Sequence, residues 1–176
     1  MRRKAQIWVE TAIYALIGLT IIGIVLAIAT PAIDRYKDKI VIEQTIAALE
    51  GLNSKILEVG GTKGSVRIVE FRVKNGELVI DSATDKISYV LKESRLEYSE
   101  PGTEIKQGEV YIKTETNGKK YDISLVLKYG ENIDLTYNGN ADEKKTFNQA
   151  SLPYKFSIEN KGETGEIVNI DIKDIS

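Results

Sequence analysis

The chain of 176 residues contains no cysteine and no histidine. Without cysteine it can form no disulfide, and without either residue it lacks the usual zinc ligands and the Ser-His and Cys-His nucleophile pairs. Its charge is nearly balanced, with 24 lysines and arginines against 26 acidic residues. A surface that binds nucleic acid needs an excess of basic residues. We therefore expect no nucleic-acid partner, and we also expect no cofactor, no metal site and no enzymatic activity.

Apolar residues are concentrated near the N-terminus. Residues 11–30 are twenty consecutive positions without a formal charge, rich in Ile, Leu, Ala and Val. Twenty helical residues extend ~30 Å, the thickness of a bilayer hydrocarbon core, and a helix satisfies its own backbone in lipid. We predict a membrane-spanning helix over about residues 11–32. The basic cluster at residues 2–4 favours a cytoplasmic N-terminus and a C-terminal domain outside the cell.

Three interpretations of this segment compete. It is a permanent single-pass anchor, a secretory signal cut at the Ala27-Ile28-Ala29 pattern, or a retained helix behind a short leader that is cut after Ala5. Glu10 favours the third, because a charge in the membrane costs roughly 2.5–3.5 kcal/mol and usually has a partner. Neither an anchor nor a removable signal needs such a residue. Snorkelling of Glu10 to the membrane surface is the competing explanation.

The stretch from Arg2 to Glu10, followed by the apolar run, resembles the class III signal peptide of archaeal type IV pilins. In that family a prepilin-type signal peptidase on the cytoplasmic side cuts after a small residue that follows basic ones. The resemblance assigns peptidase recognition to Arg3, Lys4, Ala5 and Gln6, with the cut between the last two. Glu10 would then be the fifth residue of the mature chain, where type IV pilins carry a glutamate. Trp8 and Tyr14 depart from the commonest archaeal pattern.

The resemblance implies a structural subunit of an extracellular pilus-like filament. The partners would be the signal peptidase, the lipid bilayer before assembly, and copies of the chain packed through the N-terminal helix. Glu10 would pair with the terminal amine of a neighbouring copy and set the register, and adhesion or surface attachment would be the purpose. The alternatives are a membrane-anchored binding module that does not polymerise and a secreted enzyme released after Ala29.

The helix is expected to continue beyond the membrane, over residues 6–60 in all. Apolar residues recur at helical spacing on one face, at Ile33, Tyr36, Ile40, Ile42, Ile46, Leu49, Leu52 and Ile56. Gly60 and Gly61 should end the helix. We predict bending at Pro31, which removes one backbone hydrogen bond. Gly18 and Gly23 offer either local bending or close helix packing, or are simply tolerated in lipid.

From residue 61 onward the apolar period changes from helical spacing to alternation. Several short strands follow, separated by turn residues, which predicts an antiparallel β-sandwich head domain over residues 61–176 and an α+β fold overall. The Asn75-Gly76 and Asn117-Gly118 pairs predict two hairpins. In the first predicted strand the candidates for burial are Val66, Ile68, Phe71 and Val73.

Overall fold

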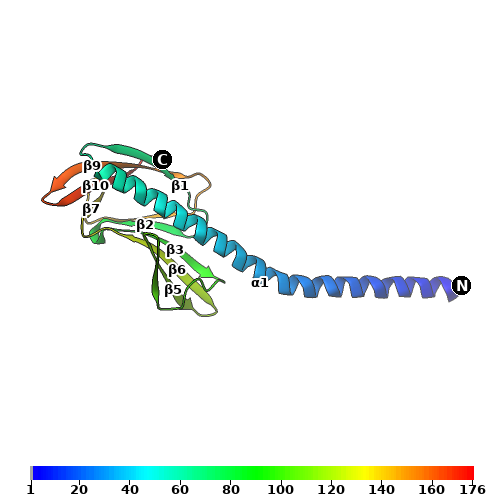
Figure 1. Cartoon of the computed structure of the whole chain (residues 1–176). Helices are drawn as coiled ribbons and strands as arrows, with labels where there is room; N and C mark the ends of the chain where they lie inside the picture. Colours follow the sequence, from blue (N-terminus) through cyan, green and yellow to red (C-terminus); the bar gives the residue numbers. More distant parts are fainter. Residues whose placement is uncertain (1) are drawn as a thin grey trace. The chain divides into compact units, whose positions relative to one another are not determined.

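The computed structural model describes the backbone of residues 2–176 and the side chains of residues 8–176 (Figure 1). The chain divides into two compact units at Lys37 and Asp38. We call residues 1–37 the N-terminal helical unit and residues 38–176 the head unit. One helix, α1 (Arg2–Gly60), is followed by β1 (Val66–Phe71), β2 (Glu77–Asp81), the 3-10 helix η1 (Ser82–Thr84), β3 (Lys86–Ser94), β4 (Glu104–Gln107), β5 (Val110–Asn117), β6 (Lys120–Lys128), β7 (Ile133–Tyr137), β8 (Lys144–Asn148), β9 (Tyr154–Thr164) and β10 (Ile167–Asp174).

The helix α1 is 59 residues long and includes Pro31. It ends at Gly60, as the glycine pair predicts, and it begins at Arg2, ahead of the predicted cleavage position. It has one segment long and apolar enough to cross a membrane, judged by length and composition. The predicted long N-terminal apolar helix is therefore confirmed.

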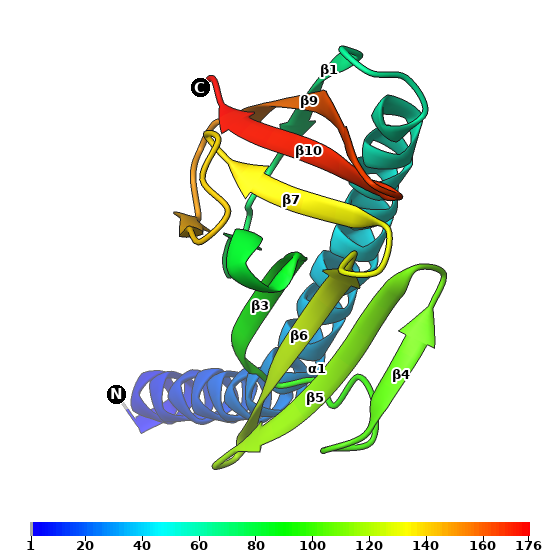
Figure 2. The same ribbon diagram turned by 90° about the vertical axis from the view of Figure 1, so that its left-hand side faces the viewer.

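The strands form two sheets, and residues 38–60 of α1 lie behind them in the view of Figure 2. The four-stranded sheet has the order β1-β9-β10-β7, and the six-stranded sheet has the order β4-β5-β6-β3-β2-β8. All pairs are antiparallel except β10 with β7, which run parallel. The predicted α+β class is confirmed, and the two sheets are consistent with the predicted sandwich, apart from this one parallel pair.

One of the two predicted hairpins is wrong. Residues Asn75 and Gly76 do not join paired strands, because β1 pairs with β9 in one sheet and β2 pairs with β3 and β8 in the other. The residues form a crossing between sheets, where Gly76 has a φ of +98° that favours glycine. The second hairpin, between β5 and β6, is confirmed, but its two-residue turn is Gly118-Lys119, one residue later than predicted, since Asn117 pairs with Lys120.

The burial predicted for β1 is half right. Phe71 and Val73 are buried, whereas Val66 and Ile68 are 44% and 65% exposed. Successive strand side chains point to opposite faces, so residues 69, 71 and 73 share the inner face and residues 66 and 68 lie on the outer one.

A single apolar core joins α1 to both sheets. The helix contributes Ile42, Ile46, Leu49, Leu52, Ile56 and Val59, which agrees with most of the predicted amphipathic face. The predicted face is wrong at Ile33, Tyr36 and Ile40, which are exposed. The first two precede the head unit, and Ile40 lies about 200° around the helix from Ile42, at 100° per residue.

Hydrogen bonds tie α1 to the head unit at both ends of this buried stretch. At the first end, an Asp38 carboxylate oxygen accepts from the Ser94 hydroxyl at 2.9 Å and from the Arg95 backbone N–H at 2.8 Å. At the other, the Asn160 side-chain amide donates to the carbonyls of Val59 and Gly60 at 3.1 and 3.0 Å. Those carbonyls have no partner within the helix, so Asn160 acts as a C-terminal cap supplied by β9.

Candidate assembly surface

The N-terminal helical unit presents a continuous apolar surface. Thirteen large side chains between residues 8 and 28 are about half exposed or more, namely Trp8, Val9, Ile13, Tyr14, Leu16, Ile17, Leu19, Ile21, Ile22, Ile24, Val25, Leu26 and Ile28. Exposed apolar patches of this extent mark membrane or protein interfaces. The surface therefore needs an apolar environment, either lipid or other protein chains.

The polar groups within this surface satisfy themselves. The hydroxyls of Thr20 and Thr30 donate to the carbonyls of Leu16 and Leu26, one turn back, at 2.8 and 2.7 Å. A β-carbon added at Gly18 or at Gly23 would have no neighbour within 4 Å, so both glycines lie on open helix surface. The segment is thus chemically suited to an environment without water.

Glu10 is the exception, because it places a carboxylate on this apolar surface. Its Oε1 accepts a hydrogen bond from the Tyr14 hydroxyl at 3.4 Å, one helical turn onward. Both side chains are exposed. A single long hydrogen bond leaves most of the acceptor capacity of a carboxylate unused, so Glu10 can accept a further, stronger donor such as an ammonium group.

The structure describes the side chains of only some of the other residues that the sequence predicts to be functional. Four of them, Arg3, Lys4, Ala5 and Gln6, have side chains outside the described part of the chain. Gly18, Gly23 and Pro31 all lie within α1. The bend predicted at these positions stays a prediction.

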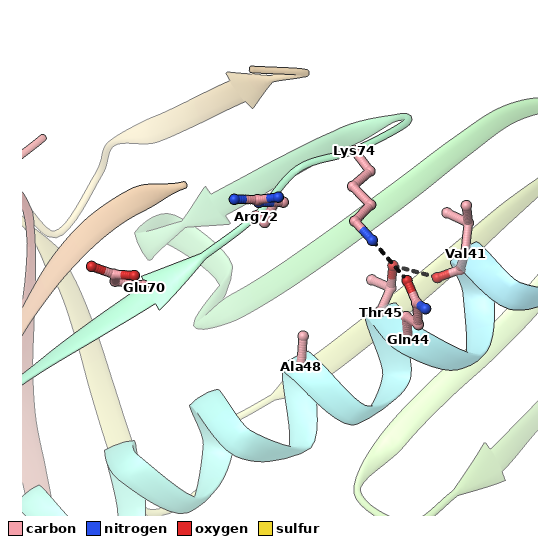
Figure 3. Close-up of a pocket in the computed structure, with 7 residues that line it drawn as sticks. All are labelled: Val41, Gln44, Thr45, Ala48, Glu70, Arg72 and Lys74. Atoms are coloured by element: carbon pink, nitrogen blue, oxygen red, sulfur yellow. Dashed lines mark hydrogen bonds between the residues drawn. The ribbon is translucent and has the colours of Figure 1, made fainter. Parts of the chain in front are cut away.

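The head unit has a groove beside the outer face of α1, shown in Figure 3. Its volume is about 260 Å³, and it is lined by Val41, Gln44, Thr45, Ala48, Glu70, Arg72 and Lys74. The Lys74 ammonium donates to the Gln44 side-chain oxygen at 3.1 Å. Glu70 pairs with Lys155 at 3.3 Å. This groove brings two cations, Arg72 and Lys74, next to the exposed side of the helix.

Near its end, α1 carries a further charged cluster. Hydrogen bonds from Lys55 and Arg67, at 2.7 and 2.9 Å, lower the pKa of the exposed Glu58 carboxyl below its ordinary value. The charge of Glu58 is thus already matched by two neighbours. This cluster is compensated within the head unit and offers little charge to a partner.

A second hollow, of about 410 Å³, lies at the ends of β3 and β6 and includes Lys86, Tyr111 and Tyr129. Burial raises the pKa of the Tyr129 phenol above its ordinary value. The Tyr129 hydroxyl has no hydrogen-bond partner among the residues whose side chains are described. Lysine ammoniums, those of Lys106 and Lys128, lie over the ring of Tyr111 at 5.4 and 4.0 Å from its centre.

Comparison of the chain with protein-family models, with curated proteins and with solved structures found no match. The geometry of the described residues is therefore what bears on function.

Sequence reasoning missed three residues that this geometry singles out. In the sequence, Arg72 and Lys74 have the pattern of ordinary polar positions in an alternating strand. Their place beside α1 becomes visible only in the folded structure. Asn160 lies a hundred residues beyond the helix end that it caps, which no local pattern reveals. The hydrogen bond between Tyr14 and Glu10 did have a signal, because residues four apart meet on a helix face.

Proposed function

We propose that this protein is a structural subunit of an extracellular filament of the type IV pilus kind. Before assembly the N-terminal helical unit lies in the membrane, and in the filament it packs against copies of itself. The proposal is carried by one observation: an exposed apolar helix surface that contains a single acid, Glu10, and is joined to a folded head unit.

The energetics support exchange of lipid for protein. Each large apolar side chain gains roughly 1.5–3 kcal/mol when it is removed from water, so the thirteen exposed side chains between Trp8 and Ile28 represent roughly 20–40 kcal/mol. Both a bilayer and a bundle of identical helices can remove these side chains from water and so provide this free energy. Leaving the membrane therefore needs a bundle that buries the same surface, which favours a filament with the helices at its centre.

Glu10 gives the bundle its register. An unpaired carboxylate among packed apolar helices is strongly disfavoured, and a carboxylate paired with a cation of a neighbouring copy is tolerated. Cleavage after Ala5 would create such a cation, the new amino group at Gln6. Only one axial offset between copies would bring the two groups together. The filament's use in adhesion or surface attachment is the further expectation from the pilin resemblance.

The test is to replace Glu10 with glutamine in the full chain and to measure the yield of filaments and the N-terminal sequence of the product. Filament yield should fall at least about tenfold, because a lost buried charge pair costs several kcal/mol. Membrane insertion and folding of the head unit should be unchanged. Glu163→Gln, which removes an exposed carboxylate from β9, is the matched control and should assemble like the wild type.

Three outcomes would contradict the proposal. The first is a wild-type product that begins at Met1 and remains a single membrane-anchored particle, as a binding module would. The second is a soluble product that lacks residues up to Ala29. The third is normal filament yield from the Glu10→Gln variant.

A further inference from the structure

The outer side of α1 within the head unit carries unlike charges along its two flanks. Between Ile40 and Glu58 this side is exposed, and it includes Gln44, Ala47 and Gly51. Arg72 and Lys74 border one flank, where they line the groove with Val41 and Ala48 (Figure 3).

The opposite flank carries acids. Glu43 and Glu50 lie about 160° around the helix from Val41 and Ala48, at 100° per residue. Glu50 contacts the turn before β5, since a β-carbon added at Gly108 would collide with its carboxylate. Glu109, the next residue, lines a hollow with Asn53 and Leu57 on this same side. The basic and acidic flanks are thus fixed by separate parts of the head unit.

Most of the charged side chains on these two flanks have no close partner of opposite charge, unlike the lysines on the sheets. On the sheets, lysines pair closely with acids, as Lys92 does with Glu77 and Lys128 with Glu104, each at 2.7 Å. Among residues 8–176, by contrast, Arg72 and Lys74 have no acidic partner and Glu50 has no basic one. Glu43 lies 3.8 Å from Lys39, and both side chains are half exposed, which makes a weak pair.

The geometry points to a second copy of this chain as the partner of this surface. We propose that α1 of one copy packs beside α1 of the next, with Arg72 and Lys74 of the first facing Glu43 and Glu50 of the second. This inference rests on the proposed filament function. It goes beyond it by placing an assembly contact in the head unit, outside the apolar segment and Glu10.

Charge also sets the relative direction of the two helices. When neighbouring helices run in the same direction, the basic flank of one meets the acidic flank of the other. In an antiparallel pair related by a two-fold axis, flanks of like charge meet and repel. For copies packed side by side the contact is therefore parallel, and because it joins two different flanks it leaves one flank of each outer copy unoccupied. Such heterologous contacts add copies without closing, as a filament requires.

Reversal of charge on one flank and then on both flanks tests the contact. The first variant is Arg72→Glu with Lys74→Glu, and the second is Glu43→Lys with Glu50→Lys, each in the full processed chain. Each should lower filament yield about tenfold, because two unlike contacts become like contacts. The variant that combines all four substitutions should return to within about threefold of wild type, since the flanks are again unlike. A mixture of the two single-flank variants should co-assemble.

The control reverses two lysines on the six-stranded sheet, Lys113→Glu with Lys120→Glu, whose acidic partners are Glu115 and Glu93. This variant should assemble like the wild type. Near-ultraviolet circular dichroism of every variant shows whether the head unit is folded. Assembly of the wild type should also weaken between about 0.1 and 1 M salt, because exposed charges are then screened.

The inference is overturned if wild-type filaments form and a folded single-flank variant forms them equally well. It is also overturned if wild-type filaments form and the folded variant with all four substitutions does not recover. Absence of any wild-type filament would instead refute the proposed function, and this contact with it. The two failures are therefore distinguishable.

Discussion

Replacing Asn160 by alanine should destabilise the head unit more than any other single change to a polar side chain in β9. Asn160 is 2% exposed. Its amide donates to the carbonyls of Val59 and Gly60, and its Oδ1 accepts from the backbone N–H of Gly162 at 2.7 Å. Alanine removes all three hydrogen bonds. The Gly60 carbonyl and the Gly162 N–H lose this partner, whereas the Val59 carbonyl still accepts from the Thr62 backbone N–H at 3.3 Å.

The expected cost follows from these contacts. Each hydrogen bond contributes about 1 kcal/mol net, and a buried donor left unsatisfied costs roughly 1–3 kcal/mol. We expect the free energy of unfolding to fall by about 3–5 kcal/mol, a large share of the stability of a domain. Asn160→Asp keeps the acceptor for Gly162 but loses both donors. It also puts a negative charge at the negative end of the helix dipole, so it should be at least as destabilising.

Urea unfolding of the full chain in detergent, followed by near-ultraviolet circular dichroism of the tyrosines, measures this loss. The only tryptophan, Trp8, lies outside the head unit, so its signal does not report on head unfolding. The control is Asn117→Ala, which removes an exposed hydrogen bond of 3.1 Å to Asp122 and should cost less than about 0.5 kcal/mol. A cost below about 1 kcal/mol for Asn160→Ala would refute the capping role.

Two further predictions use the same unfolding assay. Gly102→Ala should lower the free energy of unfolding by about 1 kcal/mol, because Gly102 has a positive φ. Gly76→Ala should lower it several times more, because Gly76 also has a positive φ and a β-carbon there would collide with the Val90 carbonyl. Equal costs would contradict this reasoning. Tyr129→Phe should leave stability at pH 7 unchanged or raised, because it removes a buried hydroxyl that lacks a partner among the described residues. Burial raises the pKa of Tyr129 above that of the unfolded chain, so the phenol ionises first in the unfolded chain and the stability of the folded protein falls as the pH rises above about 10. The wild type should therefore lose more stability than the phenylalanine variant between about pH 9 and 11, and equal losses would count against a buried phenol.

The helix was predictable from the sequence because its signals are local. The apolar run and the later amphipathic spacing both repeat within a few residues, and Gly60-Gly61 ends the pattern where the helix ends. The β5–β6 hairpin was predictable for the same reason, since its strands are joined by the two residues after Asn117.

Pairing between distant strands was not predictable in this way. Asn75-Gly76 has the composition of a hairpin turn, yet the strand before it pairs with β9, which is more than eighty residues away in sequence, and its Phe71 packs in the core. The exposure of Val66 and Ile68 follows from that pairing. The cap at Asn160 and the cations beside α1 likewise depend on tertiary structure, so short-range sequence patterns do not predict them.

The pairing of β1 with β9 has a consequence for the order in which the molecule can be made. Val66 pairs with Glu159, so the four-stranded sheet cannot close until almost the whole chain has been synthesised. Strands β2, β3, β5 and β6 pair with near neighbours in sequence and can form earlier. During that interval part of the apolar side of residues 42–59 is not covered by the four-stranded sheet. The N-terminal helical unit, which is synthesised first, can already insert into the membrane. Early insertion of that segment would hold the unfinished chain at the bilayer and away from other nascent chains, which limits aggregation.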